Sequence, residues 1–305
     1  KKAIANDYGT FETTFTIDTQ VYGATSIIAT GTSAGSAINS FFIHANVYRV
    51  SPIRGTVGSQ VEVRGSGYAA GDSVKLDFGK TLNIQSVAAD GAGKFQASFV
   101  VDVQVYGSTT VNATGVSSES ARNSFVIIPD IYQVAPTTGS VGTRVTIRGN
   151  GYAASDFVAV AFGNTSNIIS VTADRNGSIQ TVFTIDTQTF GQKVIRTTGM
   201  SSDEAVNSFS IKPQLYSVSP ARGTIGQTIE VKGTGYGMMD AVMITYVGST
   251  ETTTAEGNGY FAATFVVASQ VFGTKTVAAI GQTAGLAENV FCVIPSVYSV
   301  IPTRG

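Results

Sequence analysis

The chain has 305 residues, of which only 13% are charged, and its net charge at pH 7 is −1. This balance excludes the basic surface that nucleic acids or anionic membranes attract. No apolar run approaches the roughly 18–20 residues of a membrane span, and the single cysteine, Cys292, excludes a disulfide framework within the chain.

One motif opens each copy of a repeat, and its prolines are 84, 84 and 82 residues apart. A Gln-x-aromatic-Gly motif and an Asn that precedes Phe by two residues recur at the same spacings, so three separate landmarks fix one register. The landmarks are Pro52, Pro136, Pro220 and Pro302; Gln20, Gln104, Gln188 and Gln270; and Asn39, Asn123, Asn207 and Asn289.

This register divides the chain into five segments. Residues 50–133, 134–217 and 218–299 are three repeats, residues 1–49 are the C-terminal part of an earlier repeat, and residues 300–305 begin a further one. The first copy lacks the equivalent of residues 52–84, so we expect it to expose an apolar face and unpaired strand edges. Either the chain is a window on a longer array, which its ends within motifs favour, or a partner chain supplies the missing strands.

Within the copy at 134–217, apolar and polar residues alternate in short runs separated by Gly- and Asn-containing turns. We expect strands around residue 134 and at 143–148, 157–162, 167–172, 179–185, 194–198 and 206–211. No segment shows helical periodicity. About seven strands, with a turn roughly every 8–12 residues, predict a small antiparallel β-sandwich.

The repeated motif reads Pro-x-x-Gly-x-[Val/Ile]-Gly, continues to Gly-x-Gly-Tyr, and is followed by a Val-rich strand that ends in Phe-Gly (Phe78-Gly79, Phe162-Gly163). It resembles the IPT/TIG class of immunoglobulin-like domains over the whole chain, although the last complete copy has Tyr246-Val247-Gly248 in place of Phe-Gly. The resemblance implies an all-β chain of tandem seven-stranded sandwiches in a rod-like array. In microbial proteins it implies extracellular stalks, adhesins and surface arrays.

The linkers between copies are short and apolar, and each contains a tyrosine. They are not flexible Gly/Ser linkers. We therefore expect stiff joints in which buried apolar residues restrict bending. The predicted joint residues are Tyr48, Tyr132, Tyr216 and Tyr298, with Pro129, Pro213 and Pro295.

Few residues are suited to catalysis. The only histidine, His44, has isoleucine or lysine at the equivalent positions of the other copies, and no nucleophile motif accompanies it. We interpret His44 as a strand-end residue and Cys292 as a structural strand residue. The Gly-x-Gly-Tyr stretches are turns that need positive φ, because no helix follows to bind a phosphate. We therefore predict no catalytic residue and no enzyme activity.

Acidic residues recur at equivalent places in the repeats. Their functional interpretation is calcium binding at loops or joints, because hard cations need clustered carboxylate oxygens. The alternative is the capping of turns, in which Asp accepts backbone N–H groups. Without dense Asp-x-Asp spacing the capping interpretation is favoured, and we expect no cofactor. The recurring positions are Asp72, Asp156 and Asp240; Asp90, Asp174 and Glu256; and Asp18, Asp102 and Asp186.

The repeated Gln and Asn side chains are predicted to satisfy loop backbone groups. The aromatic residue of the Gln motif is Phe in two copies, so packing rather than a hydroxyl is its predicted role. Three sequons permit N-glycosylation, at Asn112 in a predicted strand and at Asn164 and Asn176 in predicted loops.

Similar modules in series supply length, stiffness and many equivalent surfaces. We expect a structural segment of a long extracellular or cell-surface repeat protein that forms a stalk, filament or surface-layer element. Lateral or end-to-end association with copies of itself is expected, since low charge removes repulsion. The alternative is an adhesin or carbohydrate-binding repeat array that binds cell-surface glycans. A third reading, accessory domains of a secreted enzyme, requires a catalytic module that this sequence does not contain.

Overall fold

A computed structural model describes residues 1–297, which form 26 β-strands and no helix. Contacts divide the chain into two units, Lys1–Pro129 and Asp130–Gly305, and each is described separately. The all-β prediction is confirmed. Two predicted features, the joint residue Tyr298 and the start of a further repeat at 300–305, lie outside the described residues.

The first unit begins with an antiparallel hairpin of β1 (Gly23–Gly31) and β2 (Gly35–Ile43). Within the described residues this hairpin pairs with no further strand, and residues 1–22 contain none. Most of its large apolar side chains therefore remain in contact with solvent, as the 70% exposure of Ile38 shows, whereas Ile43 at the end of β2 is buried. The expected exposed apolar face of the incomplete first copy is thus present.

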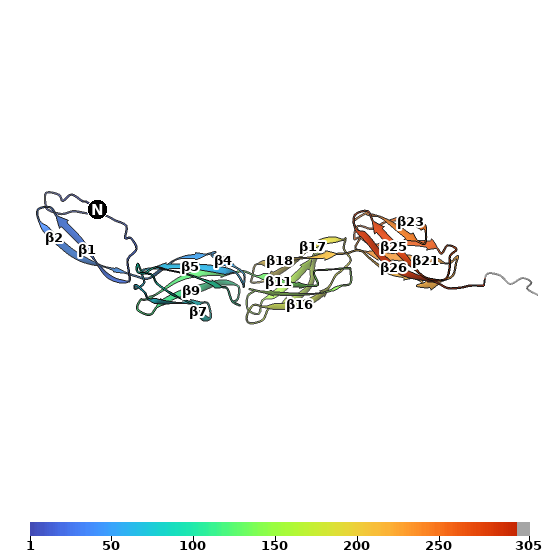
Figure 1. The fold of residues 1–305 in the computed structure, drawn as a ribbon, viewed down its shortest axis with the longest axis horizontal. Coiled ribbons are helices and arrows are strands. Elements are labelled where there is room, and N and C mark those ends of the chain that lie inside the picture. The colour runs from blue at the N-terminus through green and yellow to red at the C-terminus, as the bar shows by residue number, and fades with distance from the viewer. Residues whose placement is uncertain (298–305) are drawn as a thin grey trace, which may run out of the picture. The chain divides into compact units, whose positions relative to one another are not determined.

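The rest of the first unit is a sandwich of two sheets (Figure 1). The three-stranded sheet has the order β3-β5-β8, and the five-stranded sheet has the order β4-β10-β9-β6-β7. The strands are β3 (Asn46–Ser51), β4 (Arg54–Gly55), β5 (Gln60–Ser66), β6 (Ser73–Phe78), β7 (Thr81–Ala88), β8 (Phe95–Val100), β9 (Gly107–Gly115) and β10 (Ser120–Ile127).

The second unit contains two sandwiches with the same topology. Their three-stranded sheets are β11-β13-β16 and β19-β21-β24, and their five-stranded sheets are β12-β18-β17-β14-β15 and β20-β26-β25-β22-β23. The first sandwich has β11 (Asp130–Ala135), β12 (Thr138–Gly139), β13 (Arg144–Asn150), β14 (Phe157–Phe162), β15 (Thr165–Thr172), β16 (Ile179–Thr184), β17 (Gly191–Gly199) and β18 (Glu204–Ile211). The second has β19 (Gln214–Ser219), β20 (Arg222–Gly223), β21 (Thr228–Thr234), β22 (Ala241–Tyr246), β23 (Ser249–Thr254), β24 (Phe261–Val266), β25 (Gly273–Gly281) and β26 (Gly285–Val293).

Alternating side chains explain why these segments form strands. In β5, Val61 and Val63 are completely buried, whereas Glu62 and Arg64 face outward and form an ion pair with Nε and Oε1 2.9 Å apart. Successive side chains of a strand point to opposite faces. Each complete burial of a valine contributes about 1.5–3 kcal/mol, so the inward face drives folding.

Aromatic residues fill the space between the sheets. In the first sandwich, the ring of Phe78 lies 5.0 Å from that of Phe99 and 5.7 Å from that of Phe125. The last sandwich has Tyr246 at the Phe78 position, and its hydroxyl accepts a hydrogen bond from Gln270 Nε2 at 2.6 Å. The departure from Phe-Gly in this copy is therefore accommodated by a polar partner.

Each sandwich has eight strands, three plus five, rather than the seven expected. The additional strands are β4, β12 and β20, each two residues long and paired in parallel with the last strand of its sandwich. A segment of two residues cannot display a period-two pattern, so the sequence does not reveal it.

A β-bulge interrupts the first strand of each sandwich. In β3, Val47 and Arg49 pair with consecutive residues of β5, so Tyr48 is the extra residue. The bulge allows Val47 and Val50, three positions apart, both to face the core. Strands β11 and β19 have an irregularity at the same place.

A repeated asparagine satisfies the carbonyl group beside this bulge. In the three sandwiches its Nδ2 donates to a main-chain oxygen of the first strand at 2.8–2.9 Å, which confirms the predicted structural role for these three copies. The pairs are Asn123 with Val47, Asn207 with Ile131 and Asn289 with Leu215.

The first strands begin before the predicted repeat boundaries at 50, 134 and 218. They start at Asn46, Asp130 and Gln214 and pair with β5, β13 and β21 of the sandwich that follows. The motif proline, which is the visible landmark, comes after these strands. A boundary placed beside the proline therefore falls within a strand.

Candidate functional site

Successive repeats of the first unit are joined by a contact between a loop and a turn. The N–H of Tyr22 donates to the carbonyl oxygen of Tyr68 at 3.0 Å. Tyr22 belongs to the Gln-x-aromatic-Gly loop of the earlier repeat, and Tyr68 ends the Gly-x-Gly-Tyr turn of the next. A Cβ added to Gly93 would lie 3.2 Å from Val21 Cα, so the two repeats are in close contact here.

The second unit repeats this contact with equivalent residues. The N–H of Phe190 donates to the carbonyl oxygen of Tyr236 at 3.2 Å. The Phe190 ring also packs against the buried core of the last sandwich. A Cβ on Gly259 would lie 3.0 Å from Thr189 Cα. Packing is therefore the role of this aromatic, as predicted, and the core it packs against belongs to the following repeat.

The turn that receives the loop requires glycine. Gly93 has φ +73° and Gly259 has φ +81°, a region that residues with a Cβ rarely adopt. A Cβ at either position would also collide with the carbonyl oxygen of Tyr68 or Tyr236, which accepts the hydrogen bond from the docking loop. Backbone geometry thus keeps the acceptor oxygen accessible to the neighbouring repeat.

The tyrosine of each Gly-x-Gly-Tyr motif anchors its turn to the five-stranded sheet. Tyr68 is fully buried, and its hydroxyl donates to the carbonyl oxygen of Ala113 at 3.1 Å. The hydroxyls of Tyr152 and Thr197 are 2.6 Å apart. Burial raises the pKa of Tyr152 to about 12, and it also raises the pKa of Tyr68 and Tyr236. The predicted positive-φ turns are confirmed, with φ of +73° to +77° at the glycine before each tyrosine.

The repeated glutamine holds the docking loop in place. Gln188 is 5% exposed, and its Nε2 donates to the carbonyl oxygen of Phe162 at 3.0 Å and to Asp186 Oδ1 at 2.8 Å. Its Oε1 accepts the N–H of Asn164 at 3.1 Å. Gln104 is likewise buried and bonds to the equivalent groups. The predicted role of these amides in satisfying backbone groups is confirmed for Gln104 and Gln188. Gln20 and Gln270 instead donate to side chains, namely Asp18 Oδ1 and the hydroxyl of Tyr246.

Buried aspartates hold the hairpin between the last two strands. Asp72 is 5% exposed, and it accepts the N–H of Ser117 at 3.0 Å and the hydroxyl of Ser118 at 2.6 Å. Asp156 and Asp240 are buried equally and accept N–H groups of the equivalent hairpins. Within residues 1–297, no group of three or more His, Cys, Asp or Glu side chains is placed to hold a metal ion. These contacts support the capping interpretation.

The second set of acidic positions lies in a tight turn directly before β8, β16 and β24. Asp90 Oδ1 accepts the N–H groups of Ala92 and Lys94, both at 2.9 Å. Asp174 makes the same pair of bonds. In the last repeat, where Glu256 replaces the aspartate, the turn is capped instead by the side chain of Asn258.

The linker tyrosines do not occupy buried joints, which corrects the expectation of aromatic linkers. Their exposed fractions are 52% for Tyr48, 55% for Tyr132 and 48% for Tyr216. They lie at the bulges, where the neighbouring residues face the core and the tyrosine faces outward. Of the linker prolines, Pro129 is buried, Pro213 is half-buried and Pro295 is exposed.

His44 and Cys292 have the structural surroundings that the sequence indicates. His44 directly follows β2, and its Nδ1 lies 2.7 Å from Oε1 of Glu119 in the next repeat. The same carboxylate oxygen accepts the N–H of Ala45 at 3.1 Å. Glu119 therefore contacts the linker of the first unit at two atoms, His44 Nδ1 and Ala45 N. Cys292 is half-buried within β26.

The three sequons lie where the sequence places them. Asn164 and Asn176 are exposed in the turns on either side of β15, whereas Asn112 lies within β9. The Nδ2 of Asn112 donates to Thr114 Oγ1 at 3.1 Å and to Asp77 Oδ2 at 3.3 Å. Glycosylation of the two exposed asparagines stays a prediction.

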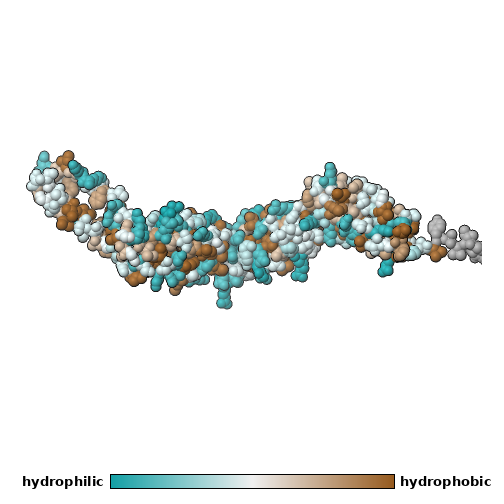
Figure 2. Space-filling view, in the orientation of Figure 1, coloured by the Kyte–Doolittle hydropathy of each residue, from teal (hydrophilic) through white to brown (hydrophobic). Residues whose placement is uncertain are grey.

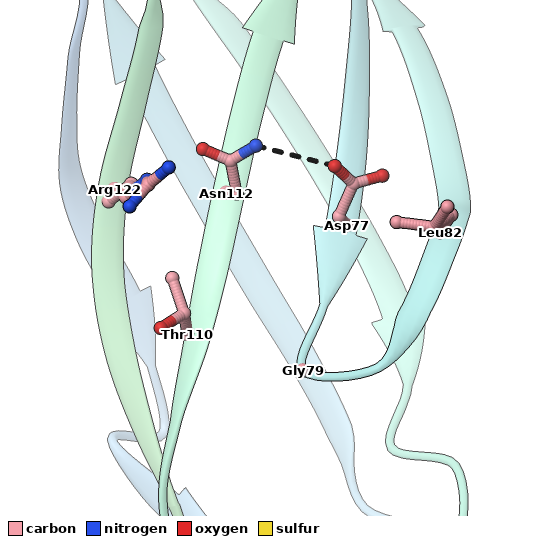
Figure 3. A pocket seen from close by; sticks show the side chains of 6 residues that line it. All are labelled: Asp77, Gly79, Leu82, Thr110, Asn112 and Arg122. Carbon is pink, nitrogen blue, oxygen red and sulfur yellow. Dashed lines mark hydrogen bonds between the residues drawn. The ribbon is translucent and has the colours of Figure 1, made fainter.

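A shallow hollow of about 230 Å³ lies on the outer face of the five-stranded sheet in the first unit (Figure 3). Its floor is a row of three directly paired residues, Asp77 on β6, Asn112 on β9 and Arg122 on β10. Leu82, which is 77% exposed, and Thr110 line its sides. The sequence reading missed this row, although comparison of the copies could have found it, because Asp77, Asn112 and Arg122 have no counterparts elsewhere.

Within residues 1–297, no helix combines the length and the apolar character that crossing a bilayer would require.

No protein-family model and no curated protein match the chain. Among solved structures it is similar to SGBP-B of the mixed-linkage glucan utilization locus of Bacteroides ovatus in complex with a heptasaccharide, at 12% identity and a TM-score of 0.28. That match covers 78% of this chain and 64% of the other, so the chain spans less than two thirds of the B. ovatus protein. A calcium-stabilised adhesin of an Antarctic bacterium that binds ice matches at 13% identity, covering 89% of this chain and 81% of the other, with a TM-score of 0.22. Four domains of the ICAM-5 ectodomain match at 12% identity, covering 82% and 76%, with a TM-score of 0.23. These similarities assign no function to the chain.

Proposed function

We propose that the chain is a structural segment of a long extracellular repeat protein, in which IPT/TIG-type immunoglobulin-like sandwiches docked in series form a stalk, filament or surface-layer element. The observation that carries this proposal is the loop-to-turn contact, which joins Tyr22 to Tyr68 in one unit and Phe190 to Tyr236 in the other. A contact that recurs between equivalent atoms is a property of the repeat. It gives successive sandwiches a defined attachment.

A structural role also agrees with how the repeated polar residues are used. The conserved positions within the repeat, such as Gln188, Asp156 and Asn207, are engaged with protein groups that hold loops and bulges. We propose that the segment has no catalytic activity and needs no cofactor. The single histidine, His44, contacts Glu119 of the next repeat, and the sequence places no nucleophile motif with it.

We propose that the partner in assembly is another copy of the chain. A net charge of −1 leaves little repulsion between neighbouring chains. Hydrophobic residues, drawn in brown, lie on the visible surface of the last sandwich in Figure 2. On the outer face of that sandwich, the paired residues Met243, Ile280 and Leu286 are 42–56% exposed. Such a face favours lateral contact.

Electron microscopy of the native material tests this proposal. Filaments or a lattice with an axial repeat of about 40 Å, the length of a sandwich with its loops, would support it. Isolated particles without lateral or end-to-end order at high protein concentration would contradict self-assembly. The segment could then still be a spacer, and binding to cells would be the next measurement.

The second candidate function is an adhesive array that binds cell-surface glycans. The observation that favours it is the polar hollow at Asp77, Asn112 and Arg122, which the structural role does not use.

A further inference from the structure

We propose that the hollow formed by Asp77, Asn112 and Arg122 binds one ring of a neutral saccharide through its hydroxyl groups. The proposal is independent of the structural role, because none of these three residues contributes to the docking of repeats. It concerns only the first complete sandwich.

The floor of the hollow contains polar groups that the protein leaves unused. Asn112 Oδ1 is screened from solvent and accepts no hydrogen bond in the structure. A buried acceptor without a donor is unfavourable. The exposed guanidinium group of Arg122, its paired neighbour across the strands, has no hydrogen bond or ion pair among the described residues. The exposed donors of Arg122 thus lie beside an unpaired acceptor, which a ligand reaches only when the side chains that cover it move aside.

The third residue of the row restricts the chemistry of the ligand. Asp77 accepts the N–H of Asn83 at 2.8 Å and the amide of Asn112 at 3.3 Å, so its carboxylate is fixed at the edge of the hollow. An anion bound to Arg122 would face this carboxylate and the free oxygen of Asn112. A cation would face the guanidinium group. An uncharged ligand whose groups both donate and accept hydrogen bonds matches Asp77, Asn112 and Arg122. A hydroxyl group can do both.

The size and lining of the hollow favour one sugar ring. Its volume of about 230 Å³ is below the about 300–1,000 Å³ of pockets that enclose larger ligands. The exposed side chain of Leu82 offers an apolar surface beside the polar row, suited to the C–H groups of a pyranose. Figure 3 shows Asp77, Asn112 and Leu82 on neighbouring strands around the opening. A polyhydroxyl ring presents both kinds of surface.

The row of Asp77, Asn112 and Arg122 occurs only in the first sandwich, although all three sandwiches have the strands that carry it. At the equivalent register positions the second sandwich has Ala161, Arg196 and Val206, and the third has Thr245, Ala278 and Glu288. Arg196 is paired with Glu204 and is therefore not free. The residues of the other repeats at these positions are therefore substitutions that the same fold accommodates.

The test is saturation-transfer difference NMR on the full chain with cellobiose, maltose and lactose as neutral probes and galacturonic acid as a charged one. Contacts of this number are expected to give millimolar affinity. We expect saturation transfer to at least one neutral disaccharide. Binding should weaken at least tenfold in Arg122→Val and Asn112→Ala, which copy the residues of the other repeats, and stay unchanged in the matched variant Arg196→Ala.

Unchanged thermal unfolding of the variants will establish that loss of binding is local. The proposal is overturned if no neutral disaccharide receives saturation, or if binding persists in both Arg122→Val and Asn112→Ala. Binding of galacturonic acid alone would also overturn it, because the site would then be an anion site.

Discussion

The backbone N–H of Phe190 and the carbonyl oxygen of Tyr236 form a 3.2 Å hydrogen bond between two successive sandwiches of the second unit. The ring of Phe190 enters the edge of the core that Tyr236 helps to form. One residue of the earlier repeat therefore supplies both a directional bond and apolar contact to the next.

Replacement of the docking aromatic should loosen the joint. In Phe190→Ala, the half-buried ring is lost from the core of the last sandwich, so we expect a loss of stability of about 1–2 kcal/mol. The matched control is Phe272→Ala, because Phe272 occupies the same position in the last repeat and is 74% exposed. Urea denaturation of both variants measures the difference. Equal midpoints for the two variants would contradict docking by Phe190.

The receiving turn should tolerate no side chain. Gly259→Ala places a Cβ in a positive-φ residue, against the carbonyl oxygen of Tyr236 and 3.0 Å from Thr189 Cα. We expect destabilisation of about 1–3 kcal/mol. Gly257→Ala in the same turn has no atom within 4 Å of the added Cβ and is the control. A midpoint for Gly259→Ala as high as for Gly257→Ala would contradict the requirement for glycine in the receiving turn.

Calcium should not change the stability of the chain. The carboxylate oxygens of Asp72 already accept main-chain N–H groups and the hydroxyl of Ser118, so a cation would have to displace these donors. We therefore expect the same thermal midpoint in calcium and in a chelator. Differential scanning calorimetry under both conditions checks this, and a rise in midpoint with calcium would refute the capping interpretation.

Strong alkali should destabilise the sandwiches through the buried tyrosines. Burial raises the pKa of Tyr152 from 10.0 to about 12, so the folded state keeps a proton that the unfolded state loses. Stability is fully present below pH 10 and decreases as the pH rises towards about 12, by about 2–3 kcal/mol for this residue. Tyr152→Phe should flatten the dependence of the unfolding free energy on pH, measured by urea denaturation. The half-exposed Tyr132, changed to Phe, is the control, and equal slopes would contradict the prediction.

Much of the fold could be predicted from the sequence because its signals are local and repeated. Alternation in segments such as 143–148 marks the strands, and the recurring Gly-x-Gly-Tyr turns mark their ends. Tyr48 shows where this reasoning fails. A bulge shifts the side-chain register by one residue, and no local pattern distinguishes the extra residue from its neighbours.

The contact between successive repeats could not be predicted from the sequence, for a different reason. The Gln-x-aromatic-Gly motif and the Gly-x-Gly-Tyr turn are both visible, and the packing role of the aromatic was correctly predicted. Their partnership is between Phe190 and Tyr236, which are 46 residues apart and in different domains, and periodicity contains no information on which loops meet. The row at Asp77, Asn112 and Arg122 likewise depends on strand register that only the folded sheet defines.

A distance measurement across the joint of the second unit tests the central claim most directly. Spin labels at Gln180→Cys and Thr252→Cys, both at exposed positions, report the arrangement of its two sandwiches in the full chain. Cys292→Ser removes the native thiol and copies Ser210 of the preceding repeat. Pulsed electron resonance should give one narrow distance distribution that broadens in Phe190→Ala. A distribution that is already broad with Phe190 in place would contradict the docking of repeats through this loop.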